Sequence, residues 1–389
     1  MLQTAHYRMN KILLFGGGLQ SLSIARGLKG QSSYIINVAD GHAVGKYSKY
    51  IDEFHKIDIN EYDISDLIHF TNNEDIKVII PLEDDYAIWV SKYKERIENN
   101  TNCKVASEIY EKILFVTNKH TLIEFCRVND IPHPETIEIP DNNNYESLAN
   151  FSYPALIKPD ISNGSRGISL IDNYNELINI APTITARYGS CSLQEYIDNN
   201  HYYNVMLYRY KDGTYAPKVA TKITRYYPVN GGSSSYCSSI SNEALFRICC
   251  NLLDNLEWHG FADFDVLESK NGDYKIIEIN PRIPASINAA LVSGIDFGKI
   301  IIDDLLFNRK PQMQYNPGAH LRCLGLDIAW FYASKDRFHA SPSWFKFFGK
   351  RLYYQDGGIK DWRAMIYSIW SGFKKQLSPS FRKAKSGMN

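Results

Sequence analysis

The sequence predicts an α/β protein with more than one domain, on the basis of three observations. The chain has 389 residues, which is enough for two or three domains with separate cores. Short apolar strands alternate with helical patterns over residues 9–112, as in a parallel, Rossmann-like sheet. A polar break at residues 141–144 then leads into a second region of strands and turns. The strands predicted in the first region are residues 11–15, 35–38 and 78–81.

A glycine-rich turn follows the first predicted strand. Gly16 and Gly18, with Asp40 about twenty residues further on, half-match a dinucleotide-binding pattern. Ser21 stands where that pattern has its third glycine. We therefore expect a tight turn that lets a helix N-terminus approach an anionic small molecule. An NAD-dependent dehydrogenase is an alternative that rests on this turn alone.

Two segments of the first domain directly follow predicted strands. They are residues 16–20 and the acidic run Glu83, Asp84 and Asp85. Ligands in open α/β sheets bind beyond the carboxyl ends of the strands. We therefore expect both segments to contribute to a substrate site.

A lysine ends an apolar strand in the second region. Lys158 closes the strand of residues 153–159, directly before a loop of small residues, 162–168. Backbone N–H groups of such a loop can close over a triphosphate, and a lysine beneath it neutralises charge. The alternative is a surface hairpin with a solvated lysine. The loop lacks the Gly-Lys-Ser/Thr ending of a Walker P-loop.

An acidic hairpin is predicted further along the chain, from strands at residues 261–267 and 276–280. The period of two in a strand places Glu278 and Asn280 on one face, and pairing brings Asp265 beside them. These oxygen ligands, completed by phosphates and water, suit Mg²⁺. Arg282, just past the second strand, suits a phosphoryl oxygen or a carboxylate. The alternative is an exposed hairpin whose acids face water.

Composition narrows the class of protein. The formal net charge is zero and 44% of residues are hydrophobic, which indicates a globular chain. The seven cysteines include no Cys-x-x-Cys pair, so neither a disulfide framework nor a zinc site is expected. Because no signal peptide and no long apolar run is visible, we expect a cytoplasmic location.

Several motifs, taken in chain order, resemble those of the ATP-grasp superfamily. They are Asn118-Lys119, Ile131-Pro132-x-Pro134, Leu156-Ile157-Lys158-Pro159 with the loop after it, Leu193-Gln194-Glu195-Tyr196-Ile197, Asp265 and Glu278-Ile279-Asn280-Pro281-Arg282. The resemblance covers about residues 10–305, and within the superfamily it points to carboxylate–amine ligases related to carbamoyl-phosphate synthase and D-aspartate ligase.

The resemblance implies an α+β ATP-grasp architecture in four parts. A Rossmann-like domain at residues 9–112 would precede an ATP-grasp small lobe region at 113–200 and a large lobe at 201–309. Residues 310–389 would form a basic, aromatic C-terminal extension outside the resemblance.

The resemblance also implies binding roles for particular residues. The groups that would contact ATP phosphates are Lys119, Lys158, Ser162, Gly164, Ser165 and Gly167. Those that would line the adenine pocket are Gln194, Glu195 and Ile197. The family usually places an acid at the ribose, and here that place falls on His201 or Tyr202. Magnesium, normally two ions and with Mn²⁺ able to replace it, would be held by Asp265, Glu278 and Asn280.

The implied reaction joins a small-molecule carboxylate to an amine. The carboxylate takes the γ-phosphate of ATP, and the amine attacks the acyl phosphate to form an amide, ADP and phosphate. Arg282 would neutralise charge on the phosphoryl group, Arg225 would steady the acyl phosphate or oxyanion, and Lys222 would belong to the loop that closes on phosphate and acceptor. A cell-envelope or glycan precursor is one class of substrate that we consider.

Two further functions remain open at this point. One is an enzyme like carbamoyl-phosphate synthase or a carboxylase that uses bicarbonate. The other is a non-catalytic nucleotide-binding protein, although the intact set Asp265, Glu278, Asn280 and Arg282 argues against it.

The C-terminal extension is strongly basic. From Lys310 onward there are fourteen Lys and Arg against four Asp, a net charge of +10. Ile366, Ile369, Trp370 and Phe373 form a helical apolar stripe. The first interpretation is a helix whose stripe packs on the large lobe, and the second is peripheral contact with the inner face of a membrane through residues 340–389. No nucleic acid is expected, because no binding motif accompanies the charge, and the sequence carries no signal for an oligomeric state.

Overall fold

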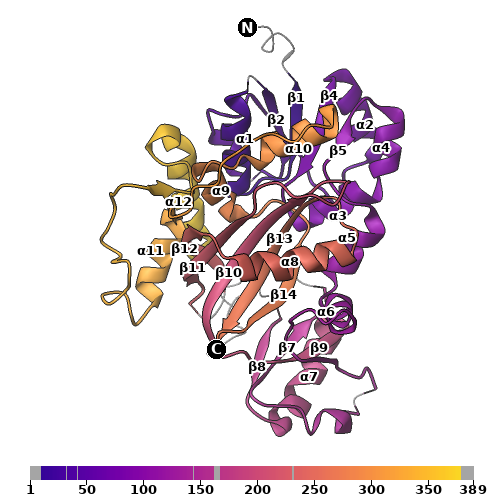
Figure 1. Cartoon of the computed structure of the whole chain (residues 1–389), viewed down its shortest axis with the longest axis vertical. Helices are drawn as coiled ribbons and strands as arrows, with labels where there is room; N and C mark the ends of the chain where they lie inside the picture. The colour runs from indigo at the N-terminus through magenta and orange to yellow at the C-terminus, as the bar shows by residue number, and fades with distance from the viewer. Residues whose placement is uncertain are drawn as a thin grey trace.

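The structure is a computed structural model of the chain, and it describes residues 10–31, 33–41, 43–142, 144–161, 167–229 and 232–377. Three β-sheets with helices on their faces make up the molecule, from the N-terminal domain at the top of Figure 1 to a small lobe at the bottom. This is the α/β class that the sequence predicts.

The N-terminal domain is built on a parallel sheet. Its strands are β1 (Lys11–Phe15), β2 (Tyr34–Ala39), β3 (Glu53–Lys56), β4 (Ile76–Pro81) and β5 (Lys104–Val105), in the order β3-β2-β1-β4-β5. Each neighbouring pair is parallel, which confirms the Rossmann-like sheet. Its helices are α1 (Leu19–Lys29), α2 (Ile64–Asn73), α3 (Asp84–Lys92) and α4 (Lys94–Asn100). The strand order reverses between β1 and β4, so the loops after these two strands meet at one edge.

The small lobe is an antiparallel sheet reached through two helices, α5 (Tyr110–Thr117) and α6 (Lys119–Val128). Its strands are β6 (Thr136–Glu138), β7 (Ala155–Pro159), β8 (Ser169–Ile171) and β9 (Cys191–Glu195), in the order β6-β9-β7-β8. Helix α7 (Tyr174–Tyr188) packs on this sheet through a shared apolar core. Strand β9 ends at Glu195, two residues before the end that the sequence predicts.

The large lobe carries most of a seven-stranded sheet. Its own strands are β10 (Asn199–Arg209), β11 (Val219–Tyr227), β12 (Ser233–Ile240), β13 (Gly260–Ser269) and β14 (Tyr274–Asn280). Helix α8 (Glu243–Asn255), capped by the side chain of Asn242, covers one face with a large apolar core. Helices α9 (Asn288–Val292) and α10 (Phe297–Phe307) follow the last of these strands.

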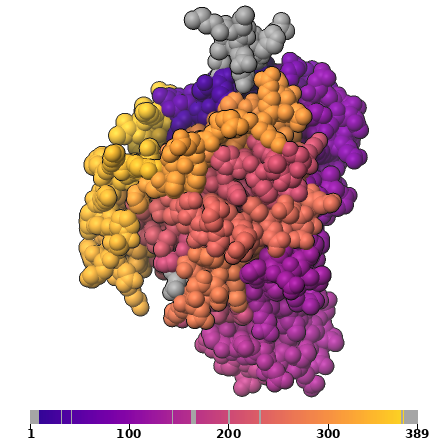
Figure 2. All heavy atoms as spheres, viewed as in Figure 1, coloured from indigo at the N-terminus to yellow at the C-terminus, as the bar shows by residue number. Residues whose placement is uncertain are grey.

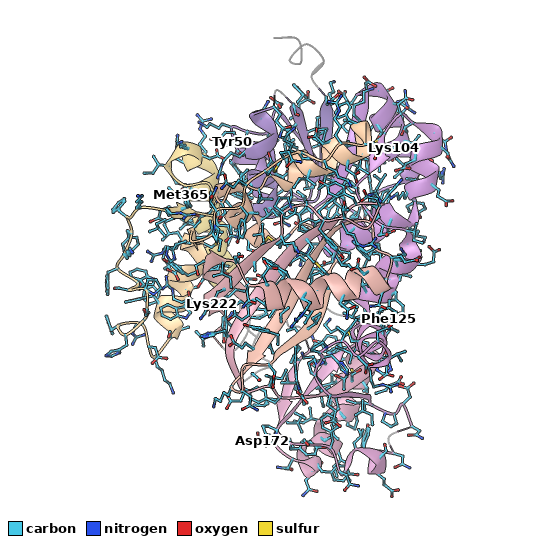
Figure 3. All side chains as sticks on the ribbon, in the orientation of Figure 1. Tyr50, Lys104, Phe125, Asp172, Lys222 and Met365 are labelled. Atoms are coloured by element: carbon cyan, nitrogen blue, oxygen red, sulfur yellow. The ribbon has the colours of Figure 1, made fainter. Side chains whose placement is uncertain are left out.

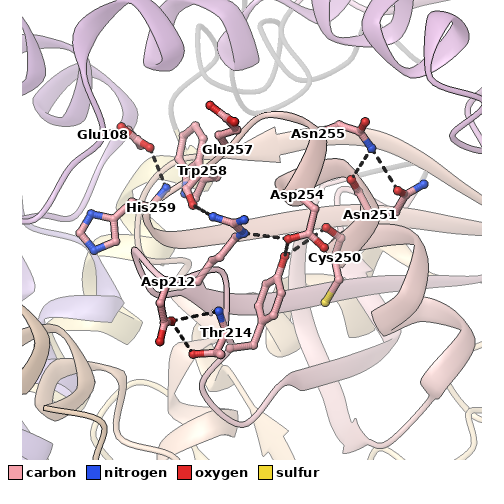
Figure 4. Close-up of polar contacts among 12 residues, drawn as sticks. Glu108, Asp212, Thr214, Cys250, Asn251, Asp254, Asn255, Glu257, Trp258 and His259 are labelled. Atoms are coloured by element: carbon pink, nitrogen blue, oxygen red, sulfur yellow. Dashed lines mark hydrogen bonds and ion pairs between the residues drawn. The ribbon is translucent and has the colours of Figure 1, made fainter.

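Polar contacts join the end of β10 to helix α8, and His259 to the segment before α5 (Figure 4). Arg209, at the end of β10, donates from Nε to Asp254 Oδ1 of α8 at 2.8 Å and from Nη1 to the Trp258 carbonyl at 2.9 Å. The backbone N–H of His259 donates to Glu108 Oε1 at 2.6 Å, which ties the large lobe to the segment before α5. One apolar core also includes both Leu14 of β1 and Ile300 of α10. The N-terminal domain and the large lobe therefore share a core, and the boundaries at 112, 200 and 309 stay predictions.

The C-terminal extension continues the large-lobe sheet. Strands β15 (His320–Arg322) and β16 (Leu352–Tyr354) complete the order β14-β13-β10-β11-β12-β15-β16. Helices α11 (Leu324–Ala333) and α12 (Trp362–Leu377) pack on each other. The extension also reaches the N-terminal domain, because Tyr367 stacks on Tyr47 at 4.2 Å and Asp361 accepts from the Ser48 hydroxyl at 2.5 Å. It is therefore part of the folded body.

The helix predicted around residues 366–373 exists as α12. The prediction that its apolar stripe packs on the large lobe is wrong for two residues of the stripe, which are exposed. Ile366 is 54% exposed and Trp370 is 68% exposed. The helix packs instead through Ala364, which is buried, and Tyr367. The apolar stripe in the sequence shows only which side chains share a face of the helix. Which face is buried depends on the η1 turn (Val44–Tyr47), a distant segment of the chain that packs against α12.

Within the described residues, no single helix has both the length and the hydrophobicity of a membrane span.

Candidate active site

A cavity of about 360 Å³ opens on the face of the large-lobe sheet opposite α8. All four parts of the chain contribute to its wall. The side chains that matter below are Leu19, Lys119, Lys158, Tyr202, Asn204, Ile223, Ser234, Asp263, Asp265, Glu278, Asn280, Arg282, Ser286, Leu326 and Gln355. Its size lies within the usual range for small-molecule sites.

The predicted acidic hairpin forms one wall of the cavity. Strands β13 and β14 pair so that Asp265 lies opposite Glu278 and Asp263 lies opposite Asn280. Phe264 and the paired Ile279 belong to the core under α8, so the period of two turns the polar side chains to the other face. The structure thus brings Asp265, Glu278 and Asn280 together as the sequence predicts. Their role as metal ligands stays a prediction.

The acids in this wall interact strongly with one another. Burial and the nearby Glu278 raise the pKa of Asp265 well above its usual range, and Asn204 donates a hydrogen bond to Asp265 Oδ1. Burial alone would raise the pKa of Glu278, but a hydrogen bond from Asp265 and the charges of Lys119, Lys158 and Arg282 outweigh it and lower that pKa to about 2. The two shifts favour a proton on Asp265, which is donated in a hydrogen bond to the charged Glu278.

Asp263 is a third acid in this wall, and the sequence reasoning missed it. It is 1% exposed, and its Oδ1 has no hydrogen-bond partner among the described residues. Burial raises the pKa of Asp263 well above its usual range, against the effect of Arg282. The signal was available, because Asp263 precedes Asp265 by two residues on the same strand and so shares its face.

These donors fit a hard divalent cation. No group of three or more His, Cys, Asp or Glu side chains in the described ranges is arranged to hold a metal by itself. Magnesium does not need such a cage, because it takes one or two carboxylates and completes its shell with phosphate and water. The raised pKa of Asp265, and the Asp263 Oδ1 that has no hydrogen-bond partner among the described residues, mark where positive charge is lacking.

Lys158 faces the acids from the small lobe. It is 9% exposed and donates from Nζ to Gln194 Oε1 at 2.5 Å. Gln194 is itself fixed, because its Nε2 donates to Thr136 Oγ1 at 3.0 Å. Burial lowers the pKa of Lys158 to about 8. Lys119, at the start of α6, lies in the same cavity wall. The structure therefore brings both lysines to the cavity, and their contacts with ATP phosphates stay a prediction.

The other described residues expected to contact the adenine or the phosphates do not line this cavity. Glu195 forms an ion pair with Lys275, and Ile197 is 8% exposed. Gly167 has a φ of +74°, and a Cβ there would come within 2.8 Å of Pro159 Cγ. The adenine and phosphate roles of these residues stay predictions. Three further residues expected to contact phosphate, Ser162, Gly164 and Ser165, lie outside the described residues.

The two residues expected near the ribose of ATP, His201 and Tyr202, lie on opposite faces of the large-lobe sheet. Tyr202 lines the cavity, whereas His201 contacts the ring of Tyr203 on the α8 side of the sheet. The structure therefore does not bring His201 to the cavity. Strand alternation is the reason, since neighbouring residues point to opposite faces.

Two expected catalytic residues are also directed away from the cavity. Lys222 pairs directly with Tyr203, which packs in the core under α8, so Lys222 (labelled in Figure 3) lies on the covered face. The register of β11 shifts between Ile223 and Arg225, and this bulge turns Arg225 away from the face that Ile223 presents. Periodicity in the sequence could not reveal that bulge.

Arg225 is instead part of a buried ion pair. It is 2% exposed and donates from Nε to Asp327 Oδ1 at 2.7 Å and from Nη2 to Oδ2 at 3.1 Å. Arg322 contacts the same carboxylate at 2.7 Å. The arrangement holds α11 of the extension against β11 and β15.

Arg282 joins the cavity to the N-terminal domain. Its Nε donates to Asp84 Oδ1 at 3.0 Å, its Nη2 donates to Asn280 Oδ1 at 3.1 Å, and its Nη1 lies 3.9 Å from Asp263 Oδ2. Asp84 opens α3 at the carboxyl end of β4, which is the segment that the sequence indicated.

The glycine turn lies beside that segment. The backbone N–H of Gly17 donates to Glu83 Oε1 at 3.0 Å, and a Cβ at Gly17 would come within 2.3 Å of the Ala43 Cβ. Burial raises the pKa of Glu83. Leu19, at the start of α1, reaches the cavity wall.

Two cavity residues come from the C-terminal extension, and no motif in the sequence points to them. They are Leu326 of α11 and Gln355, which directly follows β16. Gln355 is 3% exposed, and its Nε2 donates to the carbonyl of Ala285. Nearby, the hydroxyls of Ser234 and Ser286 have no hydrogen-bond partner among the described residues. This end of the cavity is neutral and partly apolar, unlike the acidic wall.

Part of the chain matches the model of a known domain family. Residues 116–286 match the family described as the ATP-grasp domain, so the chain contains that domain and the resemblance seen in the motifs is confirmed.

Among individual proteins, the chain is similar to the D-aspartate ligase of Enterococcus faecium (strain Aus0004), with 23% identity over 252 residues. That alignment covers 60% of this chain and 59% of the relative, so the chain matches less than two thirds of that protein.

Two solved structures share the fold. The biotin carboxylase domain of the 2-oxoglutarate carboxylase of Hydrogenobacter thermophilus, in complex with MgADP, ADP and bicarbonate, has a TM-score of 0.67 and 15% identity over 80% of this chain and 73% of that one. The L-amino acid ligase of Bacillus licheniformis has a TM-score of 0.59 and 14% identity over 77% of this chain and 75% of that one. At these identities the likeness shows the fold alone.

Proposed function

We propose that the protein is an ATP- and Mg²⁺-dependent ligase that joins a small-molecule carboxylate to an amine. The observation that carries the proposal is a single cavity in which buried acids face two lysines. Asp265, Glu278 and Asn280 lie on the large-lobe wall, and Lys119 and Lys158 lie on the small-lobe wall. That arrangement suits a metal-bound triphosphate. The similarity to D-aspartate ligase supports the carboxylate–amine class.

In the proposed reaction, an oxygen of the substrate carboxylate attacks the γ-phosphorus of ATP, and ADP leaves. The amine nitrogen then attacks the acyl carbon, phosphate leaves, and the amine loses its proton. Magnesium bound by Asp265, Glu278 and Asn280 would screen the charge of the phosphate oxygens.

In this reaction the side chains of the protein mainly position the substrates and neutralise the charge of the phosphates. Lys119 and Lys158 offset the negative charge of the phosphates, and Gln194 holds the Lys158 ammonium in place. Arg282 fixes Asn280 and lies close to Asp263, so it sets the shape of the acidic wall. The neutral end of the cavity, with Ser286 and Gln355, is left for the acceptor substrate.

A product screen tests this function. Purified protein is incubated with ATP, Mg²⁺ and pairs of amino acids and carboxylates, including the uronic acids and small peptides that occur in glycans and cell-envelope precursors. We expect ADP and phosphate to form only when both substrates are present. ADP release with bicarbonate alone would favour the carboxylase-like alternative, and AMP or NADH as the product would exclude the ligase.

A further inference from the structure

The helix α12 presents an apolar face to solvent. Trp362, Ile366 and Trp370 recur every fourth residue, so they lie along one side of the helix. They are 55%, 54% and 68% exposed, and Ile359 in the turn before the helix is 81% exposed. We call these four residues the α12 face.

The α12 face is distinct from the side by which the helix is attached. On that other side Ala364 is buried and Tyr367 stacks on Tyr47. Met365, labelled in Figure 3, marks the helix. Because α12 is anchored on one side, its exposed side chains are held in a fixed direction.

Exposed apolar side chains are concentrated in the extension as a whole. Of the nineteen large hydrophobic side chains that are exposed among the described residues, nine lie between residues 320 and 377. Besides the α12 face they are Tyr332, Phe338, Phe345, Phe348 and Tyr353. The extension forms one flank of the molecule, at the left of Figures 1 and 2. Exposed large apolar side chains that are concentrated in one part of a fold indicate a contact with another body.

The same flank carries an excess of positive charge. Between residues 310 and 377, which the structure describes, eleven Lys and Arg stand against four Asp, a net charge of +7. Three of the four acids in this segment, Asp327, Asp356 and Asp361, are at most 2% exposed, and among the bases Arg322 is fully buried. The surface of the segment therefore keeps a clear positive excess. Lys360 and Arg363 flank Trp362 in sequence, and both are exposed.

We propose that the α12 face docks on the surface of a lipid bilayer that carries anionic headgroups. Tryptophan rings flanked by lysine and arginine suit the headgroup region, where rings and aliphatic chains enter the interface and cations meet phosphate. Charge complementarity and the aliphatic part of the face together favour this partner. A second copy of the chain would bring two basic flanks together, and nucleic-acid bases stacked on Trp362 and Trp370 would leave Ile359 and Ile366 exposed to water.

Vesicle co-sedimentation at low salt tests the proposal. The full chain is mixed with vesicles of equal parts phosphatidylcholine and phosphatidylglycerol, and in parallel with phosphatidylcholine alone. We expect it to pellet with the anionic vesicles only, and to be released as salt screens the attraction. The variant W362S/I366S/W370S should lose about tenfold or more of its bound fraction.

A matched control replaces exposed aliphatic residues on the small lobe. Val128 and Ile161 are 71% and 66% exposed, and V128S/I161S should bind vesicles like the unchanged protein. Unaltered circular dichroism of both variants shows that each is folded. Quenching of tryptophan fluorescence by brominated lipid, present in the unchanged protein and lost in W362F/W370F, places the α12 face in the interface.

Three results would overturn the proposal. In the first, the unchanged protein stays in the supernatant with anionic vesicles. In the second, the W362S/I366S/W370S variant binds as well as the unchanged protein. In the third, light scattering shows a dimer that only this variant fails to form, which would make a second copy the occupant. None of these readouts depends on ligase activity.

Discussion

Arg282 of the large lobe donates a hydrogen bond from Nε to Asp84 Oδ1 of the N-terminal domain, at 3.0 Å. The same guanidinium holds Asn280, which shares the acidic wall with Asp265 and Glu278. One side chain therefore fixes both the relative position of two domains and the shape of the proposed metal site.

Replacing this guanidinium should be costly even when the positive charge is kept. We expect R282K to lower kcat/KM by about 100-fold, because an ammonium cannot make the forked contacts of Arg282. The D84N variant keeps the size of Asp84 and weakens only the domain contact, so its loss should be nearer tenfold. Steady-state ADP formation measures both. If R282K were as active as the unchanged protein, the simultaneous contacts of the Arg282 guanidinium with Asp84 and Asn280 would not be needed for activity.

The protonated state of Asp265 makes a combined test of stability and binding possible. Burial and Glu278 keep this acid neutral in the absence of a cation, so D265N replaces a neutral group by one of similar shape. We expect the free energy of unfolding at pH 7 to stay the same or to rise, while Mg²⁺-dependent ATP binding is lost. Urea denaturation and calorimetry measure the two quantities. The exposed acid Asp198 serves as the control, through D198N.

ATP binding should depend on pH through Lys158. Burial lowers its pKa to about 8, so the unliganded lysine loses its proton as the pH rises past that value. A triphosphate favours the charged form, and ATP affinity should therefore fall by up to about tenfold per pH unit above pH 8. Calorimetry in buffers of different ionisation enthalpy should also show proton uptake in that range.

Two lysine variants separate this effect from general charge. K158M should bind ATP weakly and without the pH dependence, whereas K222M should behave like the unchanged protein. Lys222 lies on the same sheet but on the face under α8. If K222M loses ATP affinity as K158M does, the orientation of β11 argued above is wrong.

The same lysine affects stability in a defined direction. A lysine whose pKa is lower in the folded protein than its usual value of 10.5 destabilises the fold below pH 8, where the folded protein must hold the buried charge. The free energy of unfolding should therefore rise between about pH 8 and pH 10.5 from this group, and K158M should remove that part of the rise. Urea denaturation across this pH range measures it.

The extension should influence the acceptor substrate more than ATP. We expect Q355A to raise KM for one of the two acceptor substrates about tenfold and to leave KM for ATP unchanged, because Gln355 lies at the neutral end of the cavity. Q312A, an exposed glutamine of the same extension, is the control. An equal rise in KM for ATP would mean that the neutral end of the cavity does not bind the acceptor substrate separately from ATP.

Arg225 should matter for stability. We expect R225M to lower the free energy of unfolding by about 3 kcal/mol, because the buried Asp327 would keep the Ser235 hydroxyl and Arg322 as partners but lose the two-pronged contact with Arg225. Chemical denaturation measures the change. A variant with full stability and no turnover would instead restore the catalytic role that the sequence suggested.

The sequence was most informative where function depends on short-range pattern. The alternation along β13 and β14 was enough to place Asp265, Glu278 and Asn280 together, and the alternation of strands and helices was enough for the N-terminal sheet. The same rule, applied to every second residue, would have included Asp263.

It was less informative where position depends on distant segments. A bulge in β11 turns Arg225 aside, and pairing with Tyr203 decides the face of Lys222. Gln355 reaches the cavity only because β15 and β16 add to the edge of the sheet. None of these arrangements is encoded in the period of the local sequence.

Trapping of the acyl phosphate tests the central claim most directly. Once a carboxylate substrate is found, the protein is incubated with that carboxylate, ATP and Mg²⁺, with hydroxylamine in place of the amine. We expect equal amounts of ADP and hydroxamate from the unchanged protein and neither from E278Q, which lacks one proposed metal ligand. ADP without hydroxamate, or AMP and pyrophosphate in its place, would contradict a ligase that works through an acyl phosphate.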